Sequence, residues 1–432
     1  MKKYSGLIFV LISFLLTCMW WFFQKPTGTT LSLRQYSELI SSLALIAFAI
    51  INFISTRNRC VDFIFAGLDT AYIYHKYVSI LGIVLIWLHN FTLKGGYGRP
   101  EAFVFMAFEP KGRPFGGMFF SAKQLGTLSL YLFTALVILF LILYKMEYEK
   151  WKLFHTIIII PYALGVVHYY LSSSYSVFAL TTFSLWMNLF NLIGVISAIY
   201  SIFLYEFIAF RHKYKITNLR EVAIDTLEIT AAAIHNKLNY KPGQFAFLKV
   251  LNKSGLFPSH PFTISNYSSN EIQFSIKVLG DHTKILKDNN LKTGDILSLA
   301  GPNGRFDYKS GKKHQIWIAG GIGITPFRSF IQSQIPSDYT VDLFYAYNNK
   351  SEGAYTDEFE AINQANLKVH LFNSSKTGFL GIKDFDKYIT NKNEEYTIYF
   401  CGPKPMRKKL KKEFKKSNFK IKGFNYEHFQ FK

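Results

Sequence analysis

Cysteine is scarce in this sequence, and so are acidic side chains. The 432 residues include three cysteines, Cys18, Cys60 and Cys401, which are widely scattered. This spacing argues against a disulfide framework and against a metal site built from cysteine. Asp and Glu number 28 against 49 Lys and Arg, so the formal net charge is +21. A chain this basic favours an anionic membrane surface or a phosphorylated cofactor as its partner.

The basic excess is unevenly distributed. Residues 1–210 carry 15 basic and 8 acidic side chains, and the remainder carries 34 and 20. The densest basic run, KPMRKKLKKEFKK at 404–416, suggests either a nucleic-acid contact or the solvated face of a helix. We interpret it as a helix face and expect no nucleic acid partner.

Long apolar runs are absent after about residue 210, whereas the first half has six of them. Each has about twenty residues, which is the length that crosses a bilayer core about 30 Å thick. The first run also resembles a signal peptide, because Lys2 and Lys3 precede it, but its aromatic residues continue through Phe23 and favour a retained helix. We therefore predict a multidomain membrane protein whose residues 1–210 form an all-α six-helix transmembrane bundle. The expected spans are 4–23, 36–55, 71–93, 124–145, 152–171 and 180–208.

The orientation of these spans follows from the loops between them. Ten Lys and Arg residues are expected on the side of the N-terminus and seven on the other side. Because basic residues accumulate in cytoplasmic loops, this bias favours a cytoplasmic N-terminus. With six spans, the C-terminal half is then also cytoplasmic, and we expect the protein to reside in the cell (plasma) membrane.

Two of the expected helices carry paired histidines. His75 and His89 are fourteen residues apart, about 21 Å of helix rise and about 40° from full register, so both rings leave one face. His155 and His168 are thirteen residues apart. A histidine in a span can simply hydrogen-bond a neighbouring helix, but ionisable residues there are costly and usually functional. Four imidazoles at two depths predict two bis-histidine b-type haems: an inner haem near the cytoplasm, held by His75 and His155, and an outer haem, held by His89 and His168.

The geometry of the second helix opposes this pairing in one respect. Thirteen residues of ideal helix place His168 about 140° away from the face of His155. Pro161 lies midway between them and is a source of a kink, because proline removes a helix hydrogen bond.

Two arginines and one loop lie near the expected haem levels. Arg34 begins the second span and Arg57 follows its end, and each can pair with a haem propionate or serve as an interfacial anchor. The loop at 94–123 can roof the outer haem or act as a plain connector.

Residues 211–308 contain short alternating strands with turn residues between them, which predicts a small antiparallel β-barrel. Three stretches stand out there: KPGQFAFL, SHPFTIS at 259–265 and IKVLGDHTKIL at 276–286. In the last, Gly280 and Thr283 indicate a tight turn that opens a helix, where free backbone N–H groups can hold a pyrophosphate. Taken singly, all three stretches are also ordinary turns of a barrel.

Residues 309–432 change to a strand, helix, strand pattern, which predicts a small α/β domain with a parallel sheet. In HQIWIAGGIGITPFRSFIQSQ a buried strand meets a glycine turn at Gly320, Gly321 and Gly323, and Pro326 is placed to begin a helix. The arrangement suits a dinucleotide phosphate, although it is not a full GxGxxG motif.

A second strand of this domain ends in YFCGPKPM. Cys401, Gly402 and Pro403 follow it at its C-terminal end, which is where α/β sheets bind ligands.

Taken in order, these motifs resemble one family. The chain is similar to a bacterial member of the NADPH oxidase and ferric reductase superfamily, in which a six-helix haem-binding domain precedes a ferredoxin–NADP reductase-like module. The resemblance is carried by the four histidines with GLDTAYIYHKY, by SHPFTIS, GGIGITPF and YFCGPKPM, and by the ending YEHFQFK. It covers nearly the whole chain and implies FAD, two haems and NADPH or NADH as cofactors.

The resemblance also implies roles for individual residues. FAD would be held by His260, Pro261, Phe262, Thr263, Lys277, Gly280 and Thr283. The nicotinamide nucleotide would be held by Gly320, Gly321, Gly323, Thr325, Pro326, Cys401, Gly402 and Pro403. Phe431, or Phe429 as the alternative, would be the aromatic side chain that moves aside for hydride transfer, with Cys401 and Thr263 beside the reacting rings.

The sequence departs from the family at two places. After the second strand of the nucleotide domain it has Asn348, Asn349 and Lys350, which leaves NADPH or NADH open, although Lys350 can serve as a point charge. Animal oxidases have a histidine one helical turn beyond the outer haem ligand, whereas this chain has Leu93. The oxygen site is therefore not fixed by a motif.

The family implies a transmembrane NAD(P)H oxidase that reduces dioxygen to superoxide outside the cytoplasm. A ferric-chelate reductase with the same electron path is the alternative, and a transporter or haem scaffold without redox turnover is the third. The loop at 94–123 carries five basic and two acidic residues, which favours dioxygen over a metal. The sequence has no EF-hand loop and no regulatory extension, so we expect no obligatory regulatory subunits.

Overall fold

The structure is a computed structural model that describes residues 4–24, 31–94, 121–143, 146, 148–173, 177–251, 259–268, 270–280, 283–284, 286 and 291–427. The chain folds as two compact units, Met1–Tyr205 and Glu206–Lys432. The expected outer loop, apart from its two ends, lies outside the described residues. The same is true of Phe429 and Phe431.

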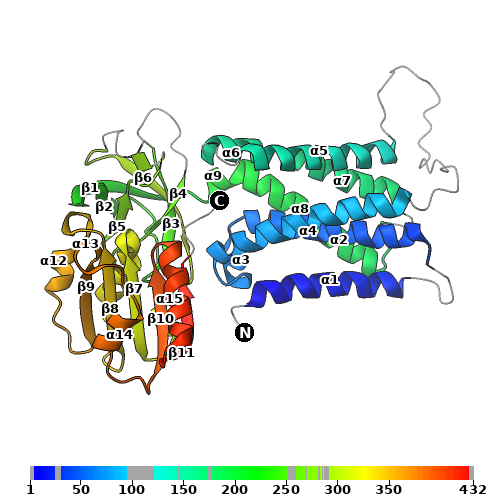
Figure 1. Cartoon of the computed structure of the whole chain (residues 1–432). Helices are drawn as coiled ribbons and strands as arrows, with labels where there is room; N and C mark the ends of the chain where they lie inside the picture. Colours follow the sequence, from blue (N-terminus) through cyan, green and yellow to red (C-terminus); the bar gives the residue numbers. More distant parts are fainter. Residues whose placement is uncertain are drawn as a thin grey trace, which may run out of the picture. The chain divides into compact units, whose positions relative to one another are not determined.

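The first unit is a bundle of long apolar helices (Figure 1). Six segments are long and apolar enough to cross a membrane, with α6 and α7 forming one segment and α8 to α9 another. Their ends differ from the predicted spans by a few residues, so the six-span prediction is confirmed. The helices are α1 (Ser5–Phe23), α2 (Leu33–Ser55), α3 (Arg59–Ile64), α4 (Leu68–Lys94), α5 (Ala122–Ile142), α6 (Tyr148–Thr156), α7 (Ile159–Ser172), α8 (Thr182–Ile199) and α9 (Tyr205–Ile208).

Polar caps mark where several of these helices begin. Ser32 and Ser121 each form a capping box with the Gln three residues later, at the starts of α2 and α5. The Thr181 hydroxyl accepts a hydrogen bond from the Ser184 N–H at the start of α8. Because the first N–H groups of a helix lack partners within it, such caps fix the boundary between a loop and an apolar span.

Helix α2 is the centre of the bundle. Its apolar window is 61% buried, against 33% or less for the other spans. Glycines allow its neighbours to approach closely, because they have no Cβ. A Cβ on Gly194 of α8 would lie 3.0 Å from the Ala49 Cα, and one on Gly82 of α4 would lie 2.7 Å from the Phe48 ring. Close packing of this kind is a main source of helix association in lipid, where the hydrophobic effect between helices is lost.

The fifth span is broken two residues after His155. Helix α6 ends at Thr156 and α7 begins at Ile159. Between them, Ile158 N–H donates to the His155 carbonyl and Ile160 N–H to the Ile157 carbonyl, three residues back. Pro161 has no N–H for the Ile157 carbonyl, which explains the break. Turns of this type advance about 120° per residue instead of about 100°, so the break rotates His168 toward the face of His155.

The second unit begins with an antiparallel barrel, as predicted. Its strands are β1 (His212–Ala223), β2 (Thr226–Ala233), β3 (Phe245–Val250), β4 (His260–Thr263), β5 (Glu271–Lys277) and β6 (Ile296–Asn303), in the order β4-β3-β6-β1-β2-β5. A bridge between Ile264 and Phe274 connects the two outer strands and closes the sheet. Alternate apolar side chains, among them Ile229, Phe274 and Leu297, fill the interior.

A parallel sheet of five strands follows, in the order β11-β10-β7-β8-β9. Both of its faces are covered by helices (Figure 1), so its strands are apolar on both sides. Trp317 of β7 belongs to the core on one face and its neighbours Ile316 and Ile318 to the core on the other. The elements are β7 (His314–Gly320), α11 (Thr325–Gln332), β8 (Thr340–Tyr347), α12 (Thr356–Glu360), β9 (Leu367–Asn373), α13 (Ser374–Thr377), α14 (Ile382–Tyr388), β10 (Glu395–Cys401), α15 (Lys404–Lys416) and β11 (Lys420–Tyr426).

Candidate functional site

The four histidines of the bundle lie in two pairs. The ring centroids of His75 and His155 are 6.1 Å apart, and those of His89 and His168 are 6.3 Å apart. A metal–imidazole bond of about 2.0–2.1 Å, with the nitrogen about 1.1 Å from its ring centroid, separates two opposed ligands by about 6.2–6.4 Å. The His89–His168 distance lies within this range and the His75–His155 distance lies 0.1 Å below it, so both are close to the spacing of two rings on opposite sides of one ion.

The pair formed by His89 and His168 is oriented by backbone carbonyl groups. The Nδ1 atom of His89 lies 2.9 Å from the Ser37 carbonyl oxygen, and the Nδ1 atom of His168 lies 2.7 Å from the Ala122 carbonyl oxygen. The Ser37 hydroxyl in turn donates to the His89 carbonyl. With Nδ1 as the donor, Nε2 of each ring keeps the lone pair that a metal needs.

In the pair formed by His75 and His155, aromatic rings contact His155. His155 stacks on Trp151 with ring centroids 4.8 Å apart and lies 5.1 Å from the ring of Phe140. Its Nδ1 atom is buried and has no hydrogen-bond partner among the described residues. No group of three or more His, Cys, Asp or Glu side chains that could hold a bare ion occurs in the part of the chain that the structure describes. Two-histidine pairs fit an iron whose other ligands come from a porphyrin.

The two arginines of the second span differ in their surroundings. Arg34 is largely exposed, and its Nε lies 3.7 Å from the Glu38 carboxylate one turn further on. The guanidinium of Arg57 lies 4.9 Å from the ring centre of Tyr205 and 6.0 Å from that of Tyr72, one turn before His75. Their roles beside a haem stay predictions.

The stretch SHPFTIS forms the edge strand β4 of the barrel. His260, Pro261, Phe262 and Thr263 pair with Leu248, Phe247, Ala246 and Phe245 of β3. Proline suits an edge strand because it cannot donate to a second neighbour. Thr263 is buried, and His260, Pro261 and Phe262 are partly exposed.

The turn after β5 is held together by Thr283. The Thr283 hydroxyl accepts hydrogen bonds from the N–H groups of Leu279 and Gly280. These two N–H groups are therefore engaged within the turn, and the binding of a pyrophosphate at the start of the helix stays a prediction. Residues 281 and 282 lie outside the described part of the chain. Lys277, at the end of β5, forms an ion pair with Glu352 at 3.4 Å.

The glycine turn after β7 packs against the end of β10. A Cβ on Gly323 would lie 2.2 Å from the Cys401 carbonyl oxygen, and one on Gly320 would lie 2.7 Å from Pro403. By contrast, Gly321 has φ +55° and open space where its Cβ would be. The structure thus brings together the C-terminal ends of two parallel strands, where α/β sheets bind ligands.

The helix that follows the turn begins where predicted. Thr325 is the first residue of α11, and its hydroxyl donates to the Ile322 carbonyl. Pro326 lies in the first turn, where its missing N–H has no cost.

Cys401 is completely buried at the end of β10. Burial raises the pKa of its thiol well above the ordinary value, and the Glu427 carboxylate raises that pKa further. A neutral thiol is a poor nucleophile, so the surroundings of Cys401 do not favour covalent attack.

Sequence reasoning missed two polar residues, Glu352 and Arg328. Glu352, beyond the end of β8, accepts hydrogen bonds from the side chains of Asn348 and Asn349. Arg328, on the helix after the glycine turn, contacts the barrel and α12 together. The partners of Arg328 are 30 or more residues away in the sequence, so no local signal marks it, whereas Glu352 lies only three and four residues from its two asparagine partners.

Three family profiles match consecutive parts of the chain. A ferric reductase like transmembrane component matches residues 40–166, an FAD-binding domain matches 211–325, and an oxidoreductase NAD-binding domain matches 317–412.

Individual relatives match only part of the chain. The electron transfer subunit of dihydroorotate dehydrogenase B from Caldanaerobacter subterraneus is 28% identical over 48% of this chain and 78% of its own length. A flavohemoprotein from Candida albicans is 30% identical over 38% of this chain and 45% of its own length. Among solved structures, the ferredoxin reductase in carbazole 1,9a-dioxygenase has a TM-score of 0.42 at 22% identity, covering 51% of this chain and 69% of that one. The three profiles, in this order in one chain, show that the protein is a transmembrane, ferric-reductase-like oxidoreductase with the architecture of the NADPH oxidase and ferric reductase superfamily.

Proposed function

We propose that this protein is a transmembrane NAD(P)H oxidase that passes electrons through FAD and two bis-histidine b-type haems to dioxygen, with superoxide as the product. The observation that carries the proposal is the pair of histidine spacings, 6.1 and 6.3 Å, within a bundle that shares its chain with FAD- and NAD-binding domains. We further propose the cell membrane as its location, with both the N-terminus and the C-terminal unit in the cytoplasm.

The bundle supports this proposal because its two histidine pairs are far apart along the helices. His75 and His89 leave α4 about 21 Å apart along the helix, which is most of a hydrocarbon layer about 30 Å thick. The carbonyl groups of Ser37 and Ala122 hold one pair of rings, and Trp151 holds one ring of the other pair. When bound, FAD would accept a hydride and, with the haems, deliver electrons singly. The chain's own residues would bind and orient the groups between which the electrons move.

In the second unit we propose that β4 and the turn after β7 hold the two reacting rings. His260 to Thr263 would line the flavin, and Gly320 to Pro326 would receive the nucleotide. Gly321 is open on its Cβ side, so a ligand can approach its backbone closely. Cys401, being buried and neutral, would support the nicotinamide through packing.

The charges beyond β8 favour NADH over NADPH. An acidic side chain there suits the free 2′-hydroxyl of NADH, whereas a 2′-phosphate needs a cation such as Arg. Glu352 is held in place by Asn348, Asn349 and Lys277, and hydrogen bonding, first from Asn348, lowers the pKa of its carboxyl. Lys350 is exposed and lies 3.7 Å from Asp357, so it offers only a weak site for a phosphate.

A ferric-chelate reductase is the second candidate, favoured by the match of residues 40–166 to a ferric reductase like component. The two functions share every step up to the outer pair of histidines. They are separated by anaerobic stopped-flow reduction with NADH or NADPH, followed by admission of dioxygen with a superoxide-specific probe. Rapid reoxidation with superoxide in good yield supports the oxidase. Reoxidation by ferric chelates but not by dioxygen would select the reductase, and the absence of any haem spectrum would remove both.

A further inference from the structure

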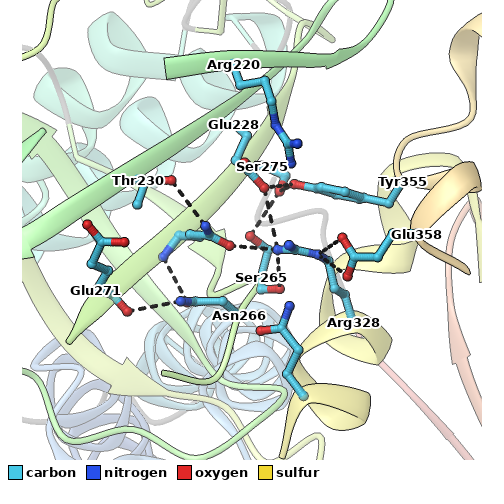
Figure 2. A network of polar contacts seen from close by, with 12 residues as sticks. Arg220, Glu228, Thr230, Ser265, Asn266, Glu271, Ser275, Arg328, Tyr355 and Glu358 are labelled. Carbon is cyan, nitrogen blue, oxygen red and sulfur yellow. Dashed lines mark hydrogen bonds and ion pairs between the residues drawn. The ribbon is translucent and has the colours of Figure 1, made fainter. Parts of the chain in front are cut away.

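A buried polar network joins the barrel to the parallel-sheet domain (Figure 2). Its centre is Arg328, which lies on the first turn of the helix after the glycine turn and is only 6% exposed. In Figure 2 its guanidinium group lies between Glu358 of α12 and side chains of the barrel strands. The network thus involves the element that begins at the proposed nucleotide site.

The Nε and Nη1 atoms of Arg328 reach different parts of the second unit. Its Nε donates to both carboxylate oxygens of Glu358, at 2.9 Å each. Its Nη1 donates to the side chain of Gln273 on β5 at 2.7 Å and to the Ser265 carbonyl at 3.3 Å. Ser265 is the last residue of SHPFTIS, so one side chain connects the proposed flavin strand with the proposed nucleotide helix.

The charges of the network are balanced. Glu228 of β2 is 3% exposed, and its Oε2 atom lies 3.5 Å from Nη1 of Arg328 and accepts a hydrogen bond from Tyr355 at 2.6 Å. Burial raises the pKa of the Tyr355 phenol, so the phenol keeps the proton that it donates. Arg220 pairs with the other oxygen of Glu228 at 3.0 Å. The two buried charges, Arg328 and Glu228, thus oppose each other, whereas Arg220 and Glu358 reach the solvent.

Two more residues of α11 dock the same helix on the barrel. The Ser329 hydroxyl accepts a hydrogen bond from the Gly243 N–H at 2.9 Å, and the Gln332 side chain accepts one from the Tyr267 N–H at 3.0 Å. Gly243 is the turn glycine of KPGQFAFL, with φ +82°, and a Cβ there would lie 2.1 Å from the Phe306 carbonyl. Helix α11 is therefore held by one backbone group from the turn before β3 and one from the segment after β4.

We propose that Arg328 is a positioning residue for hydride transfer: by bonding Ser265, Gln273 and Glu358 at once, it fixes the helix of the nucleotide turn against the flavin strand. The proposal rests on the nucleotide-to-flavin half of the proposed function. Hydride transfer requires reacting atoms about 3–3.5 Å apart, and a displacement of about 1 Å can cost about 100-fold in rate. A rigid connection between the two ring-binding elements supplies that alignment without touching either ring.

The test compares Arg328→Gln with Arg220→Gln in the full-length protein loaded with FAD. Both variants lose one arginine charge beside Glu228, but the Arg220 side chain is 55% exposed and pairs with Glu228 within the barrel. We expect Arg328→Gln to slow flavin reduction at saturating nucleotide by about 10- to 100-fold and to weaken the long-wavelength absorbance of nucleotide stacked on flavin. The dissociation constant of FAD should change less than threefold. Arg220→Gln should stay within about twofold of the wild type in all three measurements.

Two further variants keep the test decisive. Arg328→Lys retains the positive charge but not the planar guanidinium group, whose N–H donors reach several partners at once. It should therefore recover only part of the rate of flavin reduction. Glu358→Gln, at a partly exposed position, should preserve the fold and slow flavin reduction about three- to tenfold. Equal rates of flavin reduction in the wild type, Arg328→Gln and Glu358→Gln would overturn the proposal. So would a loss of rate in Arg220→Gln as large as that in Arg328→Gln, or a loss of rate in Arg328→Gln that is explained by lost FAD. If the wild-type flavin is reduced by neither NADH nor NADPH, the proposed function fails together with the inference.

Discussion

Gly323 lies so close to Cys401 that a Cβ on the glycine would be 2.2 Å from the carbonyl oxygen of the cysteine. Side-chain carbons essentially never approach a backbone oxygen so closely, so any larger residue must separate the turn after β7 from the end of β10. These two segments form the edge at which we propose that the nicotinamide nucleotide binds. Their contact is therefore a direct link between packing and function.

The first prediction concerns Gly323→Ala. Overpacking of this kind costs about 1–3 kcal/mol and shifts the backbone of the glycine turn. We expect a lower melting temperature and nucleotide affinity at least tenfold weaker, measured by flavin reduction over a range of NADH concentrations. Gly381→Ala is the matched control, because its Cβ would meet only ordinary contacts at 3.7 Å. Unchanged nucleotide affinity in Gly323→Ala would show that the contact has no part in binding.

The second prediction concerns pH and the Cys401 thiol. Its raised pKa means that the folded protein keeps the thiol proton at pH values where the unfolded chain, with an ordinary pKa of 9.0, releases it. Stability should therefore fall as pH rises above about 9, since the unfolded state then binds fewer protons than the folded state. Tyr345 and Tyr399, whose pKa values burial also raises, add a similar loss above about pH 10.

The variant Cys401→Ala lacks the thiol and should lose less stability between about pH 9 and 10 than the wild type does. Thermal melting of the FAD-loaded protein at several pH values measures this slope. The absolute melting temperature of the variant is expected to be lower at every pH, because the substitution leaves a small cavity. Parallel curves for the two proteins would contradict the prediction.

The third prediction concerns Gly126 of α5. A Cβ there would lie 2.8 Å from the His168 ring, so Gly126→Val should push this ring out of its position opposite His89. If these rings hold a haem, the haem content should fall from about two to about one per chain, and one component of the reduced spectrum should disappear. Gly165→Ala, on the same helix as His168, meets only the Ser129 hydroxyl at 3.3 Å and should keep both. Two haems retained in Gly126→Val would exclude His168 as a ligand.

Much of the fold was predictable because it follows from local patterns. Runs of apolar residues fix the spans, and alternation with turn residues fixes the barrel. The pairing of His155 and His168 with α4 was harder, because an ideal helix places their rings on different faces. The turn near Ile157, ahead of Pro161, changes that rotation, and a sequence shows the proline but not the size of the rotation.

Contacts between distant segments were not predictable. Ser37 and His89 are 52 residues apart, and Arg328 and Gln273 are 55 apart, so no spacing rule connects them. Gly323 was expected as a receiver of phosphate, whereas its position against Cys401 gives it a packing role that only the paired strands reveal. In each case the local sequence determines the element, and the register of the sheets or helices determines the partner.

The last prediction concerns nucleotide choice and Glu352. If the carboxylate of Glu352 faces the 2′ position of the ribose, its negative charge repels the 2′-phosphate of NADPH. With NADH, its oxygen atoms accept a hydrogen bond from the 2′-hydroxyl instead. Glu352→Gln removes the charge but keeps an acceptor and a similar shape. We expect the ratio of kcat/KM for NADPH to that for NADH to rise about five- to tenfold, chiefly through tighter NADPH binding.

The matched control is Glu394→Gln, which neutralises a partly exposed glutamate of the same domain that lies 3.5 Å from His314. It changes the net charge of the protein by the same amount, so any general effect of charge on nucleotide binding would appear in both variants. A shift in preference confined to Glu352→Gln would assign the 2′ site to the end of β8. Equal shifts in the two variants, or none in Glu352→Gln, would mean that the 2′ position is read elsewhere, because a carboxylate in contact with the ribose cannot be neutralised without changing that ratio.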